Sequence, residues 1–374
     1  MKKTLSILLA ALLLLSLLAG CGQAGAPEAE PSAEPVEEPS AEPVEEAETE
    51  PVEEAEALPA VTVNDDGRAR PSSCGRLQVL NGKLCSESGE PVMLRGVSTN
   101  SLIPSEDMIN EALFRELSQD VGVDLVRFAM YTYGVGILGY CTNGDKDRHK
   151  ADIAKGVELC RQNDMYALID WHILSDGDPN CYVDEAKLFF DEMAALYCDH
   201  DNVLYEICNE PNGVDWAAVK AYAEEVIPVI RARDPDSVII VGNPDWSKDL
   251  YSVAADPLDF DNILYTLHFY AATHGQEFRD MTEELSRQGL PIFVSEYGVT
   301  AASGGLPRDL ESADLWIELL ERENISYCMW AYSKSPEPCS ALRSNVLKYS
   351  GFEWDDYNAT GHWLLETLAK NKTR

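Results

Sequence analysis

Residues 125–172 read LVRFAMYTYGVGILGYCTNGDKDRHKADIAKGVELCRQNDMYALIDWH, and this segment contains the pattern from which the fold can be predicted. An apolar run of strand length at Leu125–Met130 is followed by a helical pattern at Ala151–Gln162 and by a second short run at Tyr166–Ile169. This pattern is typical of two parallel strands joined by a helix. The same alternation continues along the chain in both directions.

Eight apolar runs of strand length alternate with helical patterns between about residue 73 and the C-terminus. Eight such units over about 250 residues predict a (β/α)₈ TIM barrel. A doubly wound open sheet is the alternative, but it usually has fewer strands, and no glycine-rich phosphate loop follows the first run. The runs are Val92–Val97, Leu125–Met130, Tyr166–Ile169, Val203–Ile207, Val238–Val241, Ile263–Leu267, Ile292–Val294 and Tyr327–Trp330, and the helical patterns include Ala151–Gln162, Asp184–Leu196, Trp216–Arg233 and Ala313–Glu323.

A turn signal lies ahead of the first of these runs. Asn81-Gly82 is flanked by short apolar stretches and predicts a β-hairpin at 76–86. We expect this hairpin to close the bottom of the barrel.

The N-terminus has the features of an export signal. Lys2 and Lys3 precede an apolar run from Leu5 to Leu18, which is short for a membrane span. The segment Leu18-Ala19-Gly20-Cys21 resembles the lipobox of bacterial lipoproteins, in which the cysteine is lipidated. We therefore expect an exported protein that is lipid-anchored at the cell surface or secreted; the alternative is an ordinary signal peptide with an incidental cysteine.

Residues 22–70 have the composition of a stalk. The unit Glu-Pro-Val-Glu-Glu occurs at 34–38, 42–46 and 50–54, and residues 22–60 contain no Lys, Arg or aromatic residue. Such a segment cannot bury enough apolar surface to offset the entropy of ordering. The alternative is an acidic tail that binds a basic partner. The sequence thus predicts a signal peptide at 1–21, a disordered stalk at 22–70 and one barrel domain at 71–374.

The charge of the chain limits its partners. Asp and Glu number 65 against 29 Lys and Arg, which gives a formal net charge of −36. A polyanion repels nucleic acid and anionic lipid headgroups, so we expect no nucleic-acid partner and membrane contact only through the N-terminal anchor. We expect a monomer.

The cysteines leave their pairing open. Nine remain when Cys21 is set aside, an odd number. Cys74 with Cys85 and Cys141 with Cys181 are candidate disulfides, since export permits them, but spacing does not fix pairing. We expect buried unpaired thiols instead of disulfides at Cys160, Cys208 and Cys328, because these cysteines lie in apolar runs.

Polar or aromatic residues stand at the C-terminal ends of six predicted strands, where catalytic groups of such barrels lie. Each one has an ordinary structural explanation, but six at the same rim indicate a single site. The segments are Arg127-Phe128-Ala129-Met130-Tyr131, Asp170-Trp171-His172, Asn209-Glu210-Pro211, His268-Phe269-Tyr270, Ser295-Glu296-Tyr297-Gly298 and Trp330.

Two of these residues are carboxylic acids, Glu210 and Glu296. Side by side in a partly dry cleft they cannot both ionise cheaply, so one of them can serve as an acid near neutral pH. Two such carboxyls can cleave an acetal, one as nucleophile and one as proton donor. Arg127 can keep one of them ionised and Tyr270 can orient it, while Trp and Tyr rings suit the apolar faces of sugars.

Taken together, these residues resemble the bacterial endoglucanases of glycoside hydrolase family 5. The similarity runs in order from about Leu77 to Leu342, and it implies a (β/α)₈ barrel that hydrolyses β-1,4-glucan with retention and needs no metal or other cofactor. The segments that carry it are Leu94-Arg95-Gly96-Val97-Ser98, Ile169-Asp170-Trp171-His172-Ile173-Leu174-Ser175-Asp176, Tyr205-Glu206-Ile207-Cys208-Asn209-Glu210-Pro211-Asn212, Ile240-Val241-Gly242, Leu267-His268-Phe269-Tyr270-Ala271 and Phe293-Val294-Ser295-Glu296-Tyr297-Gly298.

The resemblance also implies the roles of individual residues. Glu210 is then the general acid/base and Glu296 the nucleophile, and Asn209 bonds the 2-hydroxyl of the sugar being cleaved. In support of catalysis, Arg127 and Tyr270 hold Glu296, His268 lies beside Glu210, and His172 binds a sugar hydroxyl. The implied substrate-binding residues are Tyr131, Trp330 under the cleaved ring, Trp246 on the leaving-group side, Asn100, Lys334 and Glu337.

The sequence departs from the family at several positions. Asn100 stands where the family commonly has His, and the usual Trp is missing from the segment that follows, Ser101-Leu102-Ile103-Pro104-Ser105. An aromatic platform for a sugar on the non-reducing side is therefore not expected from this segment. The usual Trp after the nucleophile is Tyr297, and Lys334 is displaced by one position.

Other functions stay open on the sequence. Mannan, xyloglucan and mixed-linkage glucan are alternative substrates for the same fold, and a surface lipoprotein that binds glucan without cutting it is an alternative of another class. A metal-dependent hydrolase is disfavoured, because the six His include no His-Glu-x-x-His pattern, and His268 and His274 straddle a loop.

Overall fold

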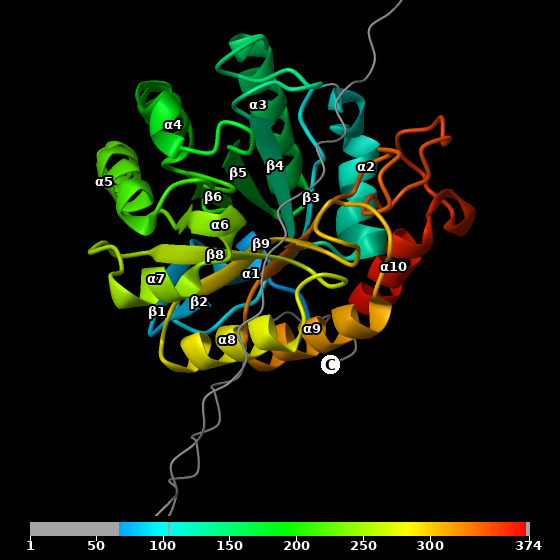
Figure 1. Ribbon diagram of the computed structural model, residues 1–374. Helices are drawn as coiled ribbons and strands as arrows, with labels where there is room; N and C mark the ends of the chain where they lie inside the picture. Colours follow the sequence, from blue (N-terminus) through cyan, green and yellow to red (C-terminus); the bar gives the residue numbers. More distant parts are fainter. Residues whose placement is uncertain (1–66, 104, 372–374) are drawn as a thin grey trace, which may run out of the picture. The chain divides into compact units, whose positions relative to one another are not determined.

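Eight parallel strands close into a barrel in the computed structural model, which describes residues 67–103 and 105–371 (Figure 1). Their order around the barrel is β10-β3-β4-β5-β6-β7-β8-β9, so each strand neighbours the next in sequence and the last pairs with the first. This confirms the predicted (β/α)₈ barrel. The strands are β3 (Arg95–Ser98), β4 (Leu125–Tyr131), β5 (Tyr166–His172), β6 (Val203–Glu206), β7 (Ile239–Val241), β8 (Ile263–Tyr270), β9 (Ile292–Gly298) and β10 (Tyr327–Met329).

Helices follow the strands and cover the barrel. Several begin at an aspartate whose side chain accepts a backbone N–H of the first turn, such as Asp145 before α3 and Asp215 before α5. Helix α3 begins at Lys146, after the cap at Asp145, which is five residues before the predicted start at Ala151. The prediction missed this first part because residues 146–150 are polar and show no apolar periodicity. The helices are α1 (Pro71–Cys74), α2 (Glu111–Glu116), α3 (Lys146–Gln162), α4 (Val183–Tyr197), α5 (Trp216–Arg231), α6 (Pro244–Ser247), α7 (Leu250–Ala255), α8 (Gln276–Arg287), α9 (Leu310–Arg322) and α10 (Ala359–Asn371), with single turns at Glu106–Met108, Leu117–Val121, Pro179–Tyr182 and Trp354–Asp356.

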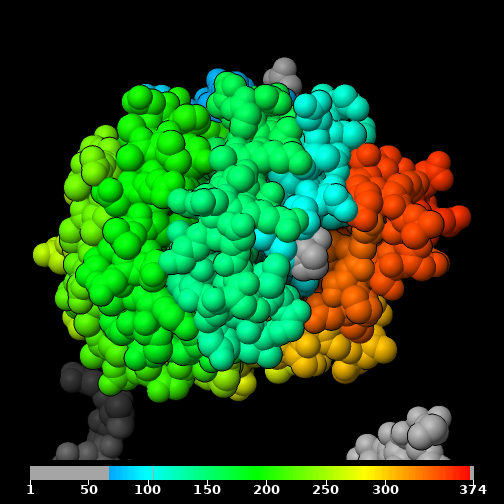
Figure 2. Space-filling model, turned by 90° about the horizontal axis from the view of Figure 1, so that it is seen from above, coloured from blue at the N-terminus to red at the C-terminus, as the bar shows by residue number. Residues whose placement is uncertain are grey.

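The two ends of the barrel sequence meet at its side. Figure 2 shows the cyan segments around α2 against the orange and red C-terminal segments. Glu116 at the end of α2 accepts hydrogen bonds from the backbone N–H groups of Gly351 and Phe352, at 2.6 and 3.1 Å. The seam between β3 and β10 is therefore covered by contacts between the first and the last parts of the domain.

The predicted hairpin is formed by β1 (Gln78–Leu80) and β2 (Lys83–Cys85), and Asn81 and Gly82 have φ of 50° and 75° at its turn. It packs on the loops that precede the last strands. The N–H of Val79 bonds the Asn262 side chain before β8, at 2.8 Å, and a Cβ at Gly82 would lie 2.4 Å from the carbonyl oxygen of Gly289 before β9. The hairpin thus covers the N-terminal ends of these strands.

The candidate disulfides are not formed, because Cys85, Cys141 and Cys181 are free thiols. In the hairpin, register places Gln78 opposite Cys85, while Cys74 lies outside the strand pair, at the end of α1. Sequence proximity to the turn therefore did not bring the two sulfurs together.

The predicted signal peptide, the lipobox with Cys21 and nearly all of the stalk lie outside the described residues. At the edge of that region, Ala69 is fully buried and the Arg68 guanidinium pairs with Asp124 at 2.9 Å. Within the described part of the chain, no helix is long and apolar enough to cross a membrane.

Candidate active site

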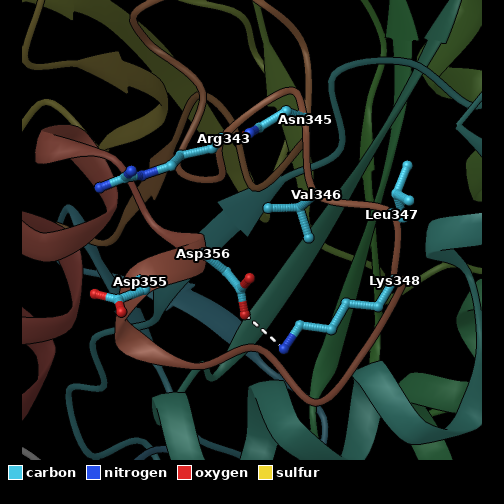
Figure 3. Close-up of a pocket in the computed structure, with 7 residues that line it drawn as sticks. All are labelled: Arg343, Asn345, Val346, Leu347, Lys348, Asp355 and Asp356. Atoms are coloured by element: carbon cyan, nitrogen blue, oxygen red, sulfur yellow. Dashed lines mark ion pairs between the residues drawn. The ribbon is translucent and has the colours of Figure 1, made fainter.

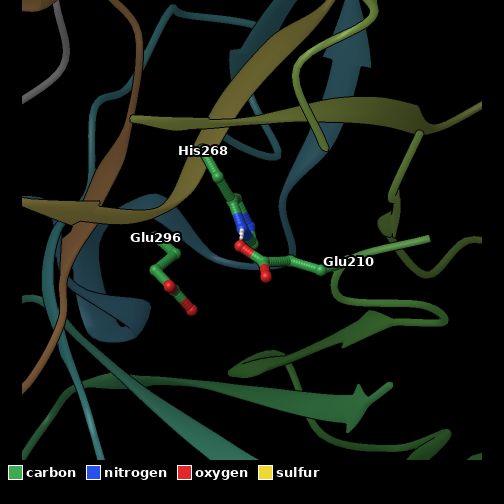
Figure 4. A group of neighbouring side chains, drawn as sticks. All are labelled: Glu210, His268 and Glu296. Carbon is green, nitrogen blue, oxygen red and sulfur yellow. Dashed lines mark hydrogen bonds and ion pairs between the residues drawn. The ribbon is translucent and has the colours of Figure 1, made fainter. Parts of the chain in front are cut away.

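Glu210 and Glu296 lie together at the C-terminal mouth of the barrel. Glu210 follows β6 and Glu296 lies within β9, and both are largely buried, with 9% and 4% of their surfaces exposed. Figure 4 shows their carboxyl groups facing the same space, with His268 bonded to Glu210. One oxygen of each carboxyl and one ring nitrogen of His268 all lie within 4.8 Å of one another. The structure therefore brings the two predicted carboxylic acids side by side.

Glu296 is oriented by two donors. The Arg127 guanidinium donates to Oε2 at 3.1 Å, and the Tyr270 hydroxyl donates to Oε1 at 2.7 Å. Burial, and then the charges of Glu296 and Glu210, raise the pKa of Tyr270 well above its usual range, so its hydroxyl keeps the proton that it donates. Both oxygens of Glu296 are thereby fixed in position.

Arg127 is fully buried and joins several polar groups inside the barrel. It forms a two-point ion pair with Glu206, at 2.7 and 3.2 Å, and lies 2.9 Å from Asp170. It also donates to the Asn209 side-chain oxygen at 2.6 Å. Burial disfavours the Glu206 carboxylate, but Arg127 and His268 outweigh it and lower the pKa of Glu206 to about 2. An ionised Glu206 thus fixes the guanidinium that orients Glu296.

His268 bridges Glu210 and the interior of the barrel. Its Nδ1 is 2.8 Å from Glu210, and its Nε2 is 3.0 Å from the Ser295 hydroxyl, which in turn donates to Glu206. Burial opposes the charged ring, but the nearby carboxyl of Glu206, 3.8 Å from Nε2, and the hydrogen bond to Glu210 outweigh it and raise the pKa of His268 to about 9. One oxygen of Glu210, one of Glu296 and a ring nitrogen of His268 lie within 4.8 Å of one another, so the charge on His268 lies next to both carboxyls. The protonated His268 ring can donate through Nδ1 to Glu210 and so position its carboxyl.

The charge of His268 predicts a pH dependence of stability. Its folded pKa of about 9 lies above the ordinary value of 6.5, so its stabilising contribution is fully present below pH 6.5 and is lost as the pH rises through 9. Across this window we expect the melting temperature of the wild type to fall by several degrees more than that of His268→Gln, which does not titrate. Thermal unfolding at a series of pH values checks this, and parallel curves for the two proteins would contradict it.

His172 has the opposite electrostatic character. Burial and the nearby Arg127 lower its pKa to about 3, so the ring is neutral at ordinary pH. Its Nδ1 lies 2.6 Å from Asp170, and the ring stacks on Trp330 at 5.2 Å between centroids and contacts Tyr131 at 4.2 Å. These contacts fix a wall of three rings beside Glu296.

Two cavities meet at Glu210. The first, of about 440 Å³, contains Glu210 and Glu296 together with Asn100, Tyr131, His172, Tyr270, Trp330 and Glu337. The second, of about 320 Å³, shares Glu210, Tyr270 and Ala302 with the first and adds Trp246, Lys248, His268 and His274. Together they form a cleft that extends to both sides of Glu210.

Trp246 presents a large surface to the second cavity. Its side chain is 46% exposed, and the Lys248 ammonium lies 5.3 Å from its ring centre. Its φ of 58° belongs to an unusual left-handed turn over Asp245–Ser247. An open aromatic face of this kind suits stacking on a sugar ring.

Lys334 lies away from the cleft. It lines neither cavity, its ammonium donates to the carbonyl of Lys348 at 3.1 Å, and it lies 3.4 Å from the centre of the Tyr349 ring. Asn100 and Glu337 do line the first cavity and are bonded to each other at 3.3 Å. Of the two residues predicted from the loop after β10, Lys334 and Glu337, only Glu337 therefore reaches the site.

Three buried residues of the site were not assigned a role from the sequence: Asp170, Glu206 and Ser295. All are fully buried and lie in the network around Arg127 and His268. The sequence did contain one sign of this network, because Glu206 is a charged residue inside the apolar run Val203–Ile207. A charge in a buried strand needs a partner of opposite sign.

A further hollow of about 420 Å³ lies on the loop between β10 and α10 (Figure 3). It shares no residue with either cavity of the cleft, and its charged groups include the partly exposed ion pair of Lys348 with Asp356, at 2.6 Å. Such pairs are common on protein surfaces and carry no chemistry. The catalytic candidate is therefore the cleft.

Comparison with known sequences finds relatives over most of the chain. The family described as Cellulase (glycosyl hydrolase family 5) matches residues 85–336. Endoglucanase A of Butyrivibrio fibrisolvens is 40% identical over 302 residues, which are 80% of this chain and 70% of that protein. An endoglucanase of Clostridium saccharobutylicum is 39% identical over 307 residues, 82% of this chain and 67% of that protein.

Solved structures show the same relationship. The catalytic domain of Thermobifida fusca endoglucanase Cel5A superposes with a TM-score of 0.76 at 36% identity, covering 80% of this chain and all of that domain. A variant of that domain in complex with cellotetraose gives the same TM-score at 35% identity. The chain therefore belongs to glycoside hydrolase family 5, the cellulase family.

Proposed function

We propose that this chain cleaves internal β-1,4 bonds of glucan with retention of configuration, with Glu296 as nucleophile and Glu210 as general acid and base. The observation that carries the proposal is the placement of oxygens of the two carboxyls within 4.8 Å of each other. Retaining glycosidases hold their carboxyls about 5–5.5 Å apart, whereas inverting enzymes need about 6.5–9.5 Å to admit a water molecule. The names of its relatives, which are endoglucanases, support β-1,4-glucan as substrate.

The lining of the cleft supports one direction for the substrate. Glu296 lines only the first cavity, while Glu210 lines both. A nucleophile must reach the anomeric carbon, so the ring that carries this carbon lies in the first cavity, and the leaving-group side lies in the second, towards Trp246. Because sugar rings fit on both sides of the carboxyl pair, the cleft suits bonds in the interior of a polymer.

In the first step, a Glu296 oxygen attacks the anomeric carbon as the bond to the leaving oxygen breaks. Glu210 gives its proton to that oxygen, and a covalent glycosyl ester on Glu296 results. The rigid contacts of Arg127 and Tyr270 hold the attacking carboxylate in position, so little reorganisation is needed at the moment of attack.

In the second step, Glu210 takes a proton from water, and the water oxygen attacks the same carbon and releases Glu296. Two inversions give net retention. His268 positions Glu210 for both roles, and Asn209, held by Arg127 and by the carbonyl of Ile173 at 2.9 Å, is placed to bond the 2-hydroxyl of the reacting ring.

Hydrolysis of a panel of polymers by the purified chain tests the proposed function. We expect carboxymethyl-cellulose to be cut, with viscosity falling sharply while few reducing ends have formed, because internal bonds are broken first. Mannan, xyloglucan and mixed-linkage glucan are the comparison substrates. Glucan binding without cleavage of any of them would contradict the proposal and favour a binding protein.

A further inference from the structure

The loop between β4 and α3, residues 132–145, presents apolar side chains to the first cavity. Tyr133, Val135 and Ile137 all line it, and Tyr133 and Val135 are 39% and 67% exposed. Single exposed apolar residues are ordinary, but three on one loop facing one cavity form a surface that a ligand can cover.

The loop is held in shape by its own hydrogen bonds. The N–H groups of Tyr140 and Cys141 bond the carbonyls of Tyr131 and Thr132 at 2.8 and 2.9 Å, which closes its base. The N–H of Gly134, next to Tyr133, bonds the Thr142 hydroxyl at 3.0 Å. A surface that is already rigid loses little conformational entropy when it binds a ligand.

The other aromatic side chains of the first cavity are engaged at the reaction centre. Tyr270 bonds Glu296, and Tyr131 and Trp330 pack on His172. Tyr133 is the aromatic lining residue that is left for a ring farther from the bond to be cut. The loop after β3, which lacks a tryptophan, contributes only Asn100 to the described lining.

We propose that Tyr133, with Val135 and Ile137, forms a distal subsite for a glucosyl ring on the non-reducing side of the cleaved bond. This inference rests on the proposed function, since the direction of the substrate follows from the roles of Glu296 and Glu210. The apolar face of the ring stacks on Tyr133. Its hydroxyls can reach polar groups of the same cavity, such as Glu337, which accepts hydrogen bonds from Asn100 and Ser335.

Aryl glycosides of defined length test the subsite, because the aryl leaving group fixes which sugars lie on the non-reducing side. The measurement is the kcat/KM for nitrophenol release from 4-nitrophenyl β-cellobioside and from the corresponding cellotrioside and cellotetraoside. In the wild type, we expect kcat/KM to rise once the oligosaccharide is long enough for a glucosyl ring to reach Tyr133. In Tyr133→Ala, this gain should shrink by about tenfold, mainly through KM, as expected for the loss of one stacking contact.

Two further variants separate stacking from general damage. Tyr133→Phe keeps the ring and should keep most of the gain. Tyr251→Ala removes a tyrosine that is 53% exposed and lines neither cavity, and it should behave as the wild type. An undiminished gain in Tyr133→Ala, or an equal loss in Tyr133→Phe, would overturn the subsite. A wild type that releases nitrophenol from none of these substrates and cuts no glucan would instead overturn the proposed function itself.

Discussion

Replacing Glu296 with glutamine is expected to lower the hydrolysis of β-glucan by about 10⁴-fold or more, because an amide cannot form the glycosyl ester. The substitution preserves the size of the side chain, and the amide oxygen can still accept from Tyr270 or Arg127. Folding should therefore be retained while chemistry is lost. Initial rates on carboxymethyl-cellulose measure the effect, and Glu284→Gln on the exposed face of α8 is the matched control, with unchanged rates.

The same variant should fail to be labelled by a mechanism-based inactivator. A 2-deoxy-2-fluoro-cellobioside with a good leaving group should attach to the peptide that contains Glu296 in the wild type, as seen by mass spectrometry, because its glycosyl ester turns over slowly. Attachment to another carboxylate, or a Glu296→Gln variant with activity near that of the wild type, would show that the nucleophile lies elsewhere.

Removing the carboxyl of Glu210 by Glu210→Ala is expected to lower activity on glucan by about 10²–10⁴-fold. The loss should be far smaller for the first step on aryl glycosides with activated leaving groups, because such groups depart without a proton. Added azide should restore turnover of these substrates, since this small anion fits where the side chain was and attacks the ester without a general base. Rates should be compared with those of Glu210→Gln, which retains the shape of the side chain.

Equal losses on glucan and on activated aryl glycosides would contradict the acid role of Glu210. The comparison between the substrates matters more than the absolute loss, because Glu210→Ala also removes a hydrogen-bond partner of His268. That disturbance affects every substrate alike, whereas a missing proton affects only the poor leaving groups.

The barrel was predictable from the sequence because its strands are buried on both faces and so read as apolar runs. Every residue of β5 and β8 is buried. The apolar run of β5 ends at Ile169, and the ladder continues through the strand-end residues to His172, which lies opposite Tyr131 on β4. Polar residues that project into the mouth of a barrel remain part of the strand, and an apolar pattern ends before them.

The carboxyl pair was predictable for a related reason. Strand ends of a parallel barrel meet at one rim, so Glu210 and Glu296 were expected at the same mouth once the fold was known. The interior network was not predictable in the same way. Whether Arg127 meets Glu206 depends on side chains crossing the barrel from β4 to β6, which the sequence of neither strand determines.

Loop conformation limited the rest of the prediction. Lys334 and Glu337 are three residues apart in the loop after β10, yet only Glu337 lines the cleft, because the Lys334 side chain packs on Tyr349. The cysteines gave a similar result, since turn signals located the hairpin but not the position of Cys74 beside it.

The stereochemistry of the first product tests the double displacement most directly. Proton NMR spectra recorded during the first minutes of cello-oligosaccharide hydrolysis distinguish the two anomers of the new reducing end before they interconvert. Attack by Glu296 followed by attack of water predicts that the β-anomer forms first and that the α-anomer appears later, by mutarotation. Initial formation of the α-anomer would contradict the mechanism, because it requires direct displacement by water.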